Sequence, residues 1–346
     1  MNNSNMETNS QSVGSNNEEK NQLLMHDPDA LHEAIAALTS ANPHMHPPQI
    51  ALHLGVPEAS LAACAISGEP QSGAMRLKPK VNEILSTING WGSVLCVFAN
   101  EGGVFMPLGN VVLTDVTDTH LALKGEHLTA QIASQAISDV YLVIQQDKMH
   151  GNTRSLQFFD ENGAMVLKVF IFHKVKFREA QKIFLALRSE DQRRTFIPFA
   201  TQNQGECASN HIDSFRGGSV EAVSGFDKSH AAELSRDETV DDAFKEGENA
   251  VINWHSQFAH ARWSGSFDKL TSDENMLHIH SKTLRAHLRF NGFQYWVKAG
   301  QQGYQAFGKR DLLLEVSTNT TPLEATQKRE VKKQLSNSQG GIENEE

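Results

Sequence analysis

The sequence predicts an α+β protein built as a tandem repeat of antiparallel β-sheet modules with covering helices. Strand-length segments with period-two apolar spacing recur along most of the chain beyond residue 90. Segments with helical spacing precede the first block of strands and follow it. A shift of 156 residues brings the second block of strands into phase with the first, which is typical of an internal repeat.

The clearest element is the segment from Arg154 to His173, RSLQFFDENGAMVLKVFIFH. Apolar residues alternate on both sides of a turn at 160–163 that ends in glycine, which is typical of a β-hairpin. Phe159, Val166 and Phe170 place apolar groups on the second face as well. We therefore expect a hairpin covered on both faces, by core residues, a helix, a partner or a flat ligand.

Composition and charge narrow the class of protein. The 346-residue chain is 39% hydrophobic and 21% charged, which is ordinary for a globular protein. Its net charge of −10 argues against binding to nucleic acid or to anionic membranes. Cys64, Cys96 and Cys207 are far apart, so a cysteine-rich zinc site is not expected. With no signal-peptide pattern and no apolar run long enough to span a bilayer, we expect a cytoplasmic protein without membrane insertion.

Changes in composition divide the chain into five parts. Residues 1–25 are rich in Asn, Ser and Glu and are expected to form a disordered tail. Residues 26–196 have the pattern of a first module, a helical cap followed by an antiparallel sheet. Residues 197–235 have the composition of a linker, 236–320 form a diverged second sheet module, and 321–346 are a charged tail.

Helices are expected in four places before the first strands. Leu31, Ile35 and Leu38 share one helical face after Pro28, and QIALHLGV, PEASLAACAI and 81–88 follow. The two short helices around Gly55 resemble a helix-turn-helix, but the second carries no Lys or Arg. We therefore favour a small helical cap over a DNA reader. The histidines of this region are expected to be solvated or capping residues and not metal ligands: His44, His46 and His53.

Strands are expected in each module, and a helix over 177–196 should cover the first sheet. In the first module they are the segments WGSVLCVF, GGVFMPLG, THLALKG, LTAQIA and VYLVIQQ, followed by the hairpin. In the second they are AVINWHSQFAHARWSG, MLHIHS, LRAHLRF, QYWVKA and RDLLLEVS.

The repeat is expected to run without a gap. The shift of 156 (310 − 154) pairs Arg310 with Arg154 and Leu312 with Leu156, so these pairs should occupy equivalent strand positions. The same shift pairs Leu277 with Leu121, Leu284 with Leu128, Ala286 with Ala130 and Gly265 with Gly109. The second copy is expected to lack most of the leading helices and the closing hairpin.

These segments resemble the bacterial cytoplasmic haem-utilisation, or hemin-degrading, family of the HemS/ChuX type. RSLQFFDENGAMVLKVF is similar to the family pattern S-I-Q-F-F-D-x-x-G-x-x-x-L-K-V, and WGSVLCVF and LALKGEHLTAQI add to the match. The resemblance covers roughly 31–316, strongly in the first half and weakly in the second. It implies the two-repeat form, with two stacked sheet modules and haem held in a cleft.

The resemblance also implies where haem contacts would lie. The axial histidine of long members comes from a helix that this chain has shortened, where only NHIDSF, with His211, is similar. An arginine of the family that reaches the haem aligns with Gln131, and a ligand histidine of the short members aligns with Ala99. The repeat equivalents of these two positions are His287 and His255.

We therefore rank His287 first, His255 second and His211 third as ligands of haem iron. Period-two spacing places Arg285 and Arg289 on the strand face of His287, where they would pair with the propionates. The alternative for this strand is a solvated face. Other histidines lie close by: His278 and His280 should share one face, whereas His255 and His260, five apart, should lie on opposite faces.

Three functions remain open at this point. The first is a haem carrier of iron acquisition that delivers imported haem to a degrading or haem-accepting protein. The second is a haem-degrading enzyme, which would need an external reductant because the chain has no GxGxxG and no P-loop. The third is a regulatory or interaction scaffold that has lost haem binding.

Overall fold

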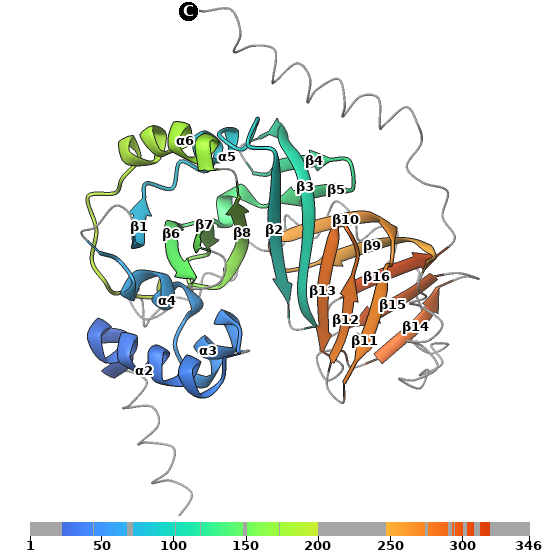
Figure 1. Cartoon of the computed structure of the whole chain (residues 1–346), viewed down its shortest axis with the longest axis horizontal. Coiled ribbons are helices and arrows are strands. Elements are labelled where there is room, and N and C mark those ends of the chain that lie inside the picture. The colour runs from blue at the N-terminus through green and yellow to red at the C-terminus, as the bar shows by residue number, and fades with distance from the viewer. Residues whose placement is uncertain are drawn as a thin grey trace, which may run out of the picture.

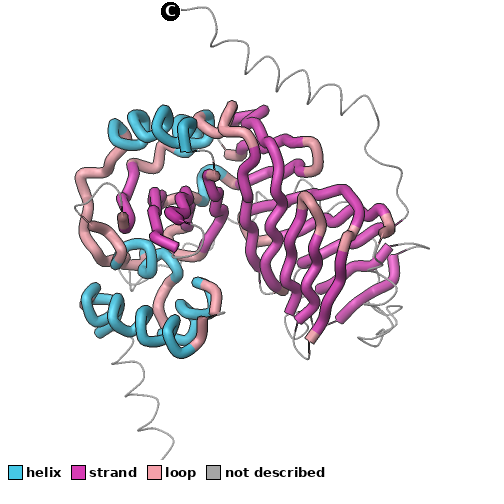
Figure 2. The backbone as a smooth tube through the Cα atoms, in the orientation of Figure 1, coloured by secondary structure: helices cyan, strands magenta, loops and turns pink. Residues whose placement is uncertain are grey.

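The computed structural model describes residues 23–199 and 247–318, apart from short gaps at 44, 68–71, 101, 118, 148–150, 173, 274–275, 290–292, 294, 300–302 and 308–311. Antiparallel strands are the main element of this part, and the helices gather around the first half of the chain (Figures 1 and 2). No helix within these ranges has the length and apolar character needed to cross a membrane. The expected tails and linker fall almost entirely outside the described residues.

Three helices form a cap at one end of the first half: α2 (Pro28–Ala41), α3 (Pro47–Leu54) and α4 (Glu58–Cys64). The side chain of Asp27 starts α2 by accepting the backbone N–H groups of Asp29 and Ala30, both at 3.0 Å. The cap encloses a small apolar cluster of its own, made by Leu24, Leu31, Val56 and Cys64.

The first module is one sheet with the order β1-β6-β7-β8-β2-β3-β4-β5. The predicted hairpin is confirmed as β7 (Gly151–Phe159) and β8 (Met165–Ile171). Its turn ends at Gly163, whose φ of +81° favours glycine. The remaining strands are β1 (Gly73–Leu77), β2 (Ser93–Asn100), β3 (Gly103–Val116), β4 (Leu121–Gly125), β5 (Leu128–Ile132) and β6 (Asp139–Asp147).

Two further helices close the end of the first module opposite the cap, α5 (Val81–Ser86) and α6 (Lys174–Ala186). Helix α6 buries Phe177 and Phe184 in the main core, as a covering helix should. The expectation of a helix as far as residue 196 is wrong. The chain beyond α6 instead surrounds the buried Arg76, whose guanidinium donates to Asp191 Oδ2 at 2.6 Å and to the carbonyl of Thr195 at 2.9 Å.

The second module repeats the strand order of the first. Strands β14-β15-β16-β9-β10 and β11-β12-β13 correspond to β6-β7-β8-β2-β3-β4-β5, with β10 and β11 together in the place of β3. The tandem repeat is therefore confirmed. The strands are β9 (Asn249–His255), β10 (Ala259–Ser266), β11 (Lys269–Ser272), β12 (Met276–His280), β13 (Leu284–Arg289), β14 (Tyr295–Ala299), β15 (Gly303–Phe307) and β16 (Leu312–Thr318).

The gapless alignment holds only up to β14. In the first copy Lys168 pairs with Val97, and in the second Glu315 pairs with Asn253. The shift is still 156 on β9 (253 − 97) but is 147 on β16 (315 − 168), because the strands at the end of the second copy are shorter. Leu312 therefore begins β16, the counterpart of β8, whereas Leu156 lies on β7. The closing hairpin, expected to be missing, is present as β15–β16, and Arg310 is outside the described residues.

The two modules exchange edge strands. Strand β13 pairs with β3, where His287 faces Val104, and β5 pairs with β10, where Gln131 faces His260. A shift of 156 turns one contact into the other (104 to 260, and 131 to 287), so the halves are related by a pseudo-two-fold axis. The sheets are therefore joined edge to edge and are not merely stacked.

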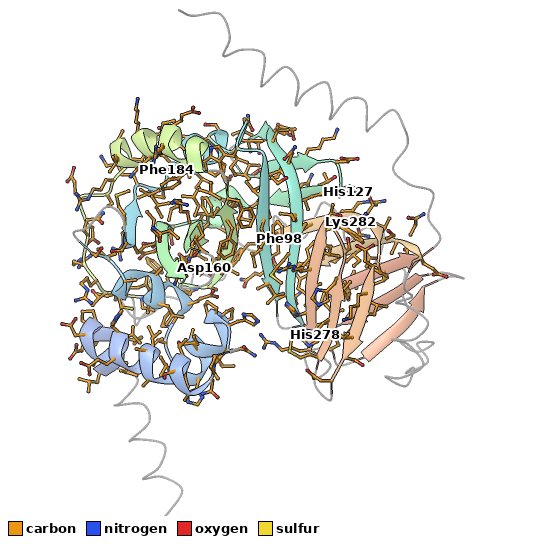
Figure 3. The ribbon with its side chains drawn as sticks, in the orientation of Figure 1. Phe98, His127, Asp160, Phe184, His278 and Lys282 are labelled. Atoms are coloured by element: carbon orange, nitrogen blue, oxygen red, sulfur yellow. The ribbon has the colours of Figure 1, made fainter. Side chains whose placement is uncertain are left out.

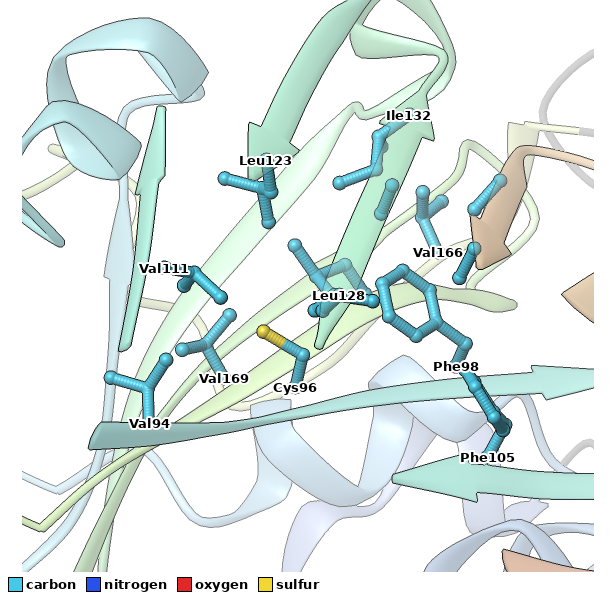
Figure 4. Close-up of a cluster of buried hydrophobic side chains, with 14 of the residues drawn as sticks. Val94, Cys96, Phe98, Phe105, Val111, Leu123, Leu128, Ile132, Val166 and Val169 are labelled. Atoms are coloured by element: carbon cyan, nitrogen blue, oxygen red, sulfur yellow. The ribbon is translucent and has the colours of Figure 1, made fainter. Parts of the chain in front are cut away.

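The core lies between the inner faces of the two halves. The ring of Phe105 stacks on that of Trp254 with centroids 5.5 Å apart, and both side chains are fully buried. On the first-module side of this core, Phe98, Phe105 and Leu128 converge with Cys96 and other aliphatic side chains (Figure 4). The hairpin is covered on both faces, as expected, because Phe158 lies in this core and Phe159 packs in a second cluster with Ala59 of α4.

Candidate functional site

One outward surface crosses the boundary between the modules, and we call it face A. Direct cross-strand pairing places Ala99 beside Val104, Val104 beside His287 and His287 beside His278, all on the same side of the sheet. Ala99 and Val104 are only partly buried, and so is Met106 two residues further along β3. Face A therefore combines an apolar floor from the first module with histidines from the second.

Four histidines meet at the edge of face A: His46, His278, His280 and His287. The Nδ1 atoms of His278 and His287 are 2.6 Å apart, a short hydrogen bond between two rings that lie edge to face. The ring of His46, at the start of α3, stacks on His287 with centroids 5.8 Å apart, and His280 lies at 6.3 Å. In Figure 3, His278 is on the side of the second module that faces the helical cap.

His287 is held neutral by its surroundings. Burial lowers the pKa of its ring to about 4, and protonation of His278, His46 and His280 would oppose its own charge. The guanidinium of Arg285 acts in the same direction. A neutral imidazole is the form that binds a metal, so His287 is in the protonation state that a ligand needs.

The predicted propionate partners lie beside this histidine. Arg285 and Arg289 occupy the same side of β13 as His287, Arg285 exposed and Arg289 partly buried. Arg285 pairs across the strands with Met106 and with His280. The alternative of a fully solvated strand face does not describe His287, which is partly buried.

The pseudo-two-fold axis places a second outward surface on the other side of the molecule, and we call it face B. It carries Asn253, His255, His260 and Arg262 of the second module together with Gln131 of the first. His255, the second-ranked ligand candidate, has its Nε2 atom 3.2 Å from Glu315 Oε2, so this ring nitrogen is already paired with a carboxylate.

His255 and His260 do not lie on opposite faces as expected. Strands β9 and β10 form a hairpin in which these two residues are cross-strand partners, and their rings stack 4.5 Å apart. Burial lowers the pKa of His260 to about 4, with a further contribution from His255. The Nε2 atom of His260 is buried without a hydrogen-bond partner among the described residues.

The structure therefore separates the candidate residues. His287, Arg285 and Arg289 come together on face A, whereas His255 and the exposed Gln131 belong to face B. His211 lies outside the described residues. A pocket of about 400 Å³ near α5, lined by residues such as Pro79, Glu83 and Thr117, contains none of the candidates.

Sequence reasoning missed His46 and Asp273 as neighbours of this site. His46 precedes α3 and reaches His287 through tertiary packing, so no local pattern could have linked the two. Asp273 Oδ2 lies 3.4 Å from His278 Nε2, and Asp273 begins the turn that leads from β11 to β12. The sequence signal for this cluster was the period-two spacing of His278 and His280, and both rings lie next to His287.

Comparison with known proteins identifies the first module. Residues 55–187 match the family model described as the haemin-degrading HemS.ChuX domain. This part of the chain is a HemS/ChuX domain. No curated protein sequence matched the chain.

The HemS/ChuX fold extends over both modules. The chain is similar to the holo form of PhuS, a heme-binding protein from Pseudomonas aeruginosa, with a TM-score of 0.69 and 17% identity over 88% of this chain and 98% of that one. It is also similar to the heme degrading enzyme ChuS of Escherichia coli O157:H7, with a TM-score of 0.65 and 15% identity over 90% and 99% of the two chains. At these identities the likeness establishes the two-module fold.

The residues of face A fit haem better than those of face B. An iron porphyrin needs an axial donor, apolar contact for its flat ring and cations for its propionates. Face A has the neutral His287, the apolar floor around Val104, and two arginines. Face B also has a neutral histidine, His260, but this residue occupies the place of Val104, so the apolar floor is missing there, and His255 is paired to Glu315.

Proposed function

We propose that this protein is a cytoplasmic haem-binding protein of iron acquisition that carries imported haem to a haem-accepting or haem-degrading protein. The observation that carries the proposal is the position of His287, a neutral, partly buried imidazole beside an apolar strand face. The HemS/ChuX domain supports haem handling, and the names of PhuS and ChuS show that proteins of this fold bind haem or degrade it.

In this proposal each group on face A has one task. The ring of His287 provides one nitrogen ligand to the iron. The porphyrin already fills four coordination positions of that iron. Ala99, Val104 and Met106 cover one side of the macrocycle and keep water from it. Arg285 and Arg289 pair with the propionates, since guanidinium groups bind carboxylates well.

Titration of the purified full chain with hemin tests this function. We expect a Soret band that saturates at one haem and stays intact when ascorbate is added, as a carrier requires. Bleaching with release of iron would make the protein a ring-opening enzyme. The absence of any Soret shift would overturn haem binding and favour the alternative of a regulatory or interaction scaffold.

A pair of variants assigns the ligand. His287→Ala should shift the Soret band and weaken binding more than tenfold, because the loss of an iron ligand cannot be replaced by packing. His53→Ala, an exposed histidine on α3, is the matched control and should bind like the unmodified protein. If His287→Ala also binds normally while His211→Ala loses the axial ligand, face A is not the site.

A further inference from the structure

We propose that Asp273 and His278 are positioning residues that hold His287 in the tautomer whose Nε2 carries a free lone pair. The inference rests on the proposed function, because the tautomer matters only if Nε2 has a ligand to bind. It assigns a role to two residues that are not themselves proposed to contact haem.

The three side chains form a continuous hydrogen-bonded row. Asp273 Oδ1 accepts the backbone N–H of Met276 at 2.9 Å, and the backbone N–H of Asp273 donates to the carbonyl of Met276 at 3.0 Å. This turn between β11 and β12 fixes the carboxylate, whose Oδ2 lies 3.4 Å from His278 Nε2. His278 Nδ1 in turn lies 2.6 Å from His287 Nδ1.

The row has a direction because a carboxylate can only accept. His278 Nε2 therefore donates to Asp273, and a neutral imidazole has a single N–H, so His278 Nδ1 is an acceptor. The short contact between the two Nδ1 atoms then requires His287 to donate from its own Nδ1. His287 Nε2 is left without a hydrogen, which is the form that coordinates iron.

The reverse arrangement is unfavourable at both ends. It would set a lone pair of His278 Nε2 against the lone pairs of Asp273, and it would put a hydrogen on His287 Nε2 where a ligand has to bind. The direction of the row therefore follows from the two contacts that His278 makes, with Asp273 on one side and with His287 on the other.

The cluster offers one nitrogen and not a chelate. No three His, Cys, Asp or Glu side chains of the described residues are arranged to hold a metal ion. A bare cation needs several protein ligands, whereas haem iron needs one or two because the porphyrin fills four positions. Among the described residues, the ring of His287 makes its only hydrogen bond through Nδ1, so Nε2 is not engaged in one.

The tautomers can be observed without haem. In the full chain labelled with ¹⁵N in its histidine rings, assignment through His278→Gln and His287→Gln gives the protonation of each nitrogen by NMR. We expect hydrogen on Nε2 of His278 and on Nδ1 of His287 at pH 7.5. Hydrogen on Nε2 of His287, or a doubly protonated His278, would overturn the inference.

Asp273→Asn should reverse the direction of the hydrogen bonds between these three side chains. The amide oxygen stays with the N–H of Met276, so the amide NH₂ faces His278 Nε2 and forces it to accept. His287 should then carry its hydrogen on Nε2, and hemin affinity should fall about 10- to 100-fold, as for other lost partners of metal-bound histidines. Asp268→Asn is the matched control. Its carboxylate also accepts a backbone N–H in a turn, that of Lys282 at 2.8 Å, and among the described residues it has no hydrogen bond to a histidine ring.

The outcomes separate this inference from the proposed function. If the unmodified protein gives no Soret band, the proposal of haem binding is wrong. The NMR measurement of the ring tautomers still tests whether the hydrogen bonds run from His287 through His278 to Asp273. If it binds hemin through His287 and Asp273→Asn binds equally well, the positioning role is wrong and haem binding stands. Circular dichroism and urea denaturation of Asp273→Asn should match those of the unmodified protein, so that a loss of hemin affinity is not a loss of folding.

Discussion

Faces A and B occupy equivalent places in the repeat but differ in chemistry. On face A the first module supplies Val97, Ala99, Val104 and Met106, and the second supplies Arg285 and His287. On face B the corresponding residues are Asn253, His255, His260, Arg262, Thr129 and Gln131. The apolar members therefore all come from one copy and most of the histidines from the other.

This difference shows that a repeat need not yield two equal sites. Each face takes strands from both copies, so a substitution in one copy changes either the floor of one face or the edge of the other. His46, at the start of α3, reaches face A from the helical cap. The same backbone thus presents an apolar floor beside His287 on one side and mainly polar side chains around His260 on the other.

The largest loss of stability is expected from a substitution in the core that lies beneath both faces. Phe105→Ala removes a fully buried ring that stacks on Trp254 beneath the strands of both faces. We expect the free energy of unfolding to fall by about 3–5 kcal/mol, measured by urea denaturation. Phe172→Ala, whose ring is 55% exposed, should change it little. Equal effects of the two variants would contradict the shared core.

A smaller change should damage face A alone. Gly103 has a φ of +145°, and a Cβ added there would clash with the carbonyl oxygen of His287. Gly103→Ala should cost about 1–3 kcal/mol through backbone strain and should weaken the β3–β13 contact. Its repeat counterpart is Ala259, where Ala259→Gly should cost only roughly 0.5–1 kcal/mol. A tolerated Gly103→Ala would argue against tight β3–β13 pairing.

Both faces should respond to acid in the same direction. His260 and His287 each have a pKa of about 4, below the usual 6.5 of the unfolded chain, chiefly because of burial. As the pH falls from 6.5 to 4, the unfolded chain binds protons that these folded rings resist, so stability is lost. His260→Gln and His287→Gln should each reduce the drop in Tm between pH 7 and pH 5. His53→Gln, an exposed control, should keep the full drop.

The smallest effect should be electrostatic and limited to haem binding. Arg285→Gln should weaken hemin binding about two- to fivefold, because exposed ion pairs contribute at most about 1 kcal/mol. The loss should shrink as salt is added. Arg262→Gln removes an exposed arginine of face B and should leave the affinity unchanged. Equal losses in both variants would remove the distinction between the faces.

Local patterns were enough for much of the fold. The hairpin formed by β7 and β8 follows from alternation and one glycine turn. The correspondence between the strands of the two copies follows, as far as β14, from spacing kept in phase. The hairpin between His255 and His260 was missed because the turn between them has no Gly or Pro. It is instead closed by Ser256, whose N–H donates to the carbonyl of Ala259 at 2.8 Å.

Features that depend on distant residues were beyond the sequence. Helix α6 stops at Ala186 because the segment beyond it is needed to neutralise Arg76, far away in the chain. The pairing of β3 with β13 likewise joins segments that no periodicity relates. The period-two pattern put His287 on the same strand face as Arg285. Its contacts with His46 and with His278 could be seen only in the folded molecule.

The strand exchange between β3 and β13, and between β5 and β10, has a consequence for the origin of the chain. Two reciprocal contacts around a two-fold axis are the pattern of an isologous homodimer, in which each subunit lends the same edge to the other. A single gene for one half would have sufficed to build both contacts. In a single polypeptide each half carries its own residues, so one surface can differ from its counterpart, as faces A and B do, which a homodimer of identical halves does not allow.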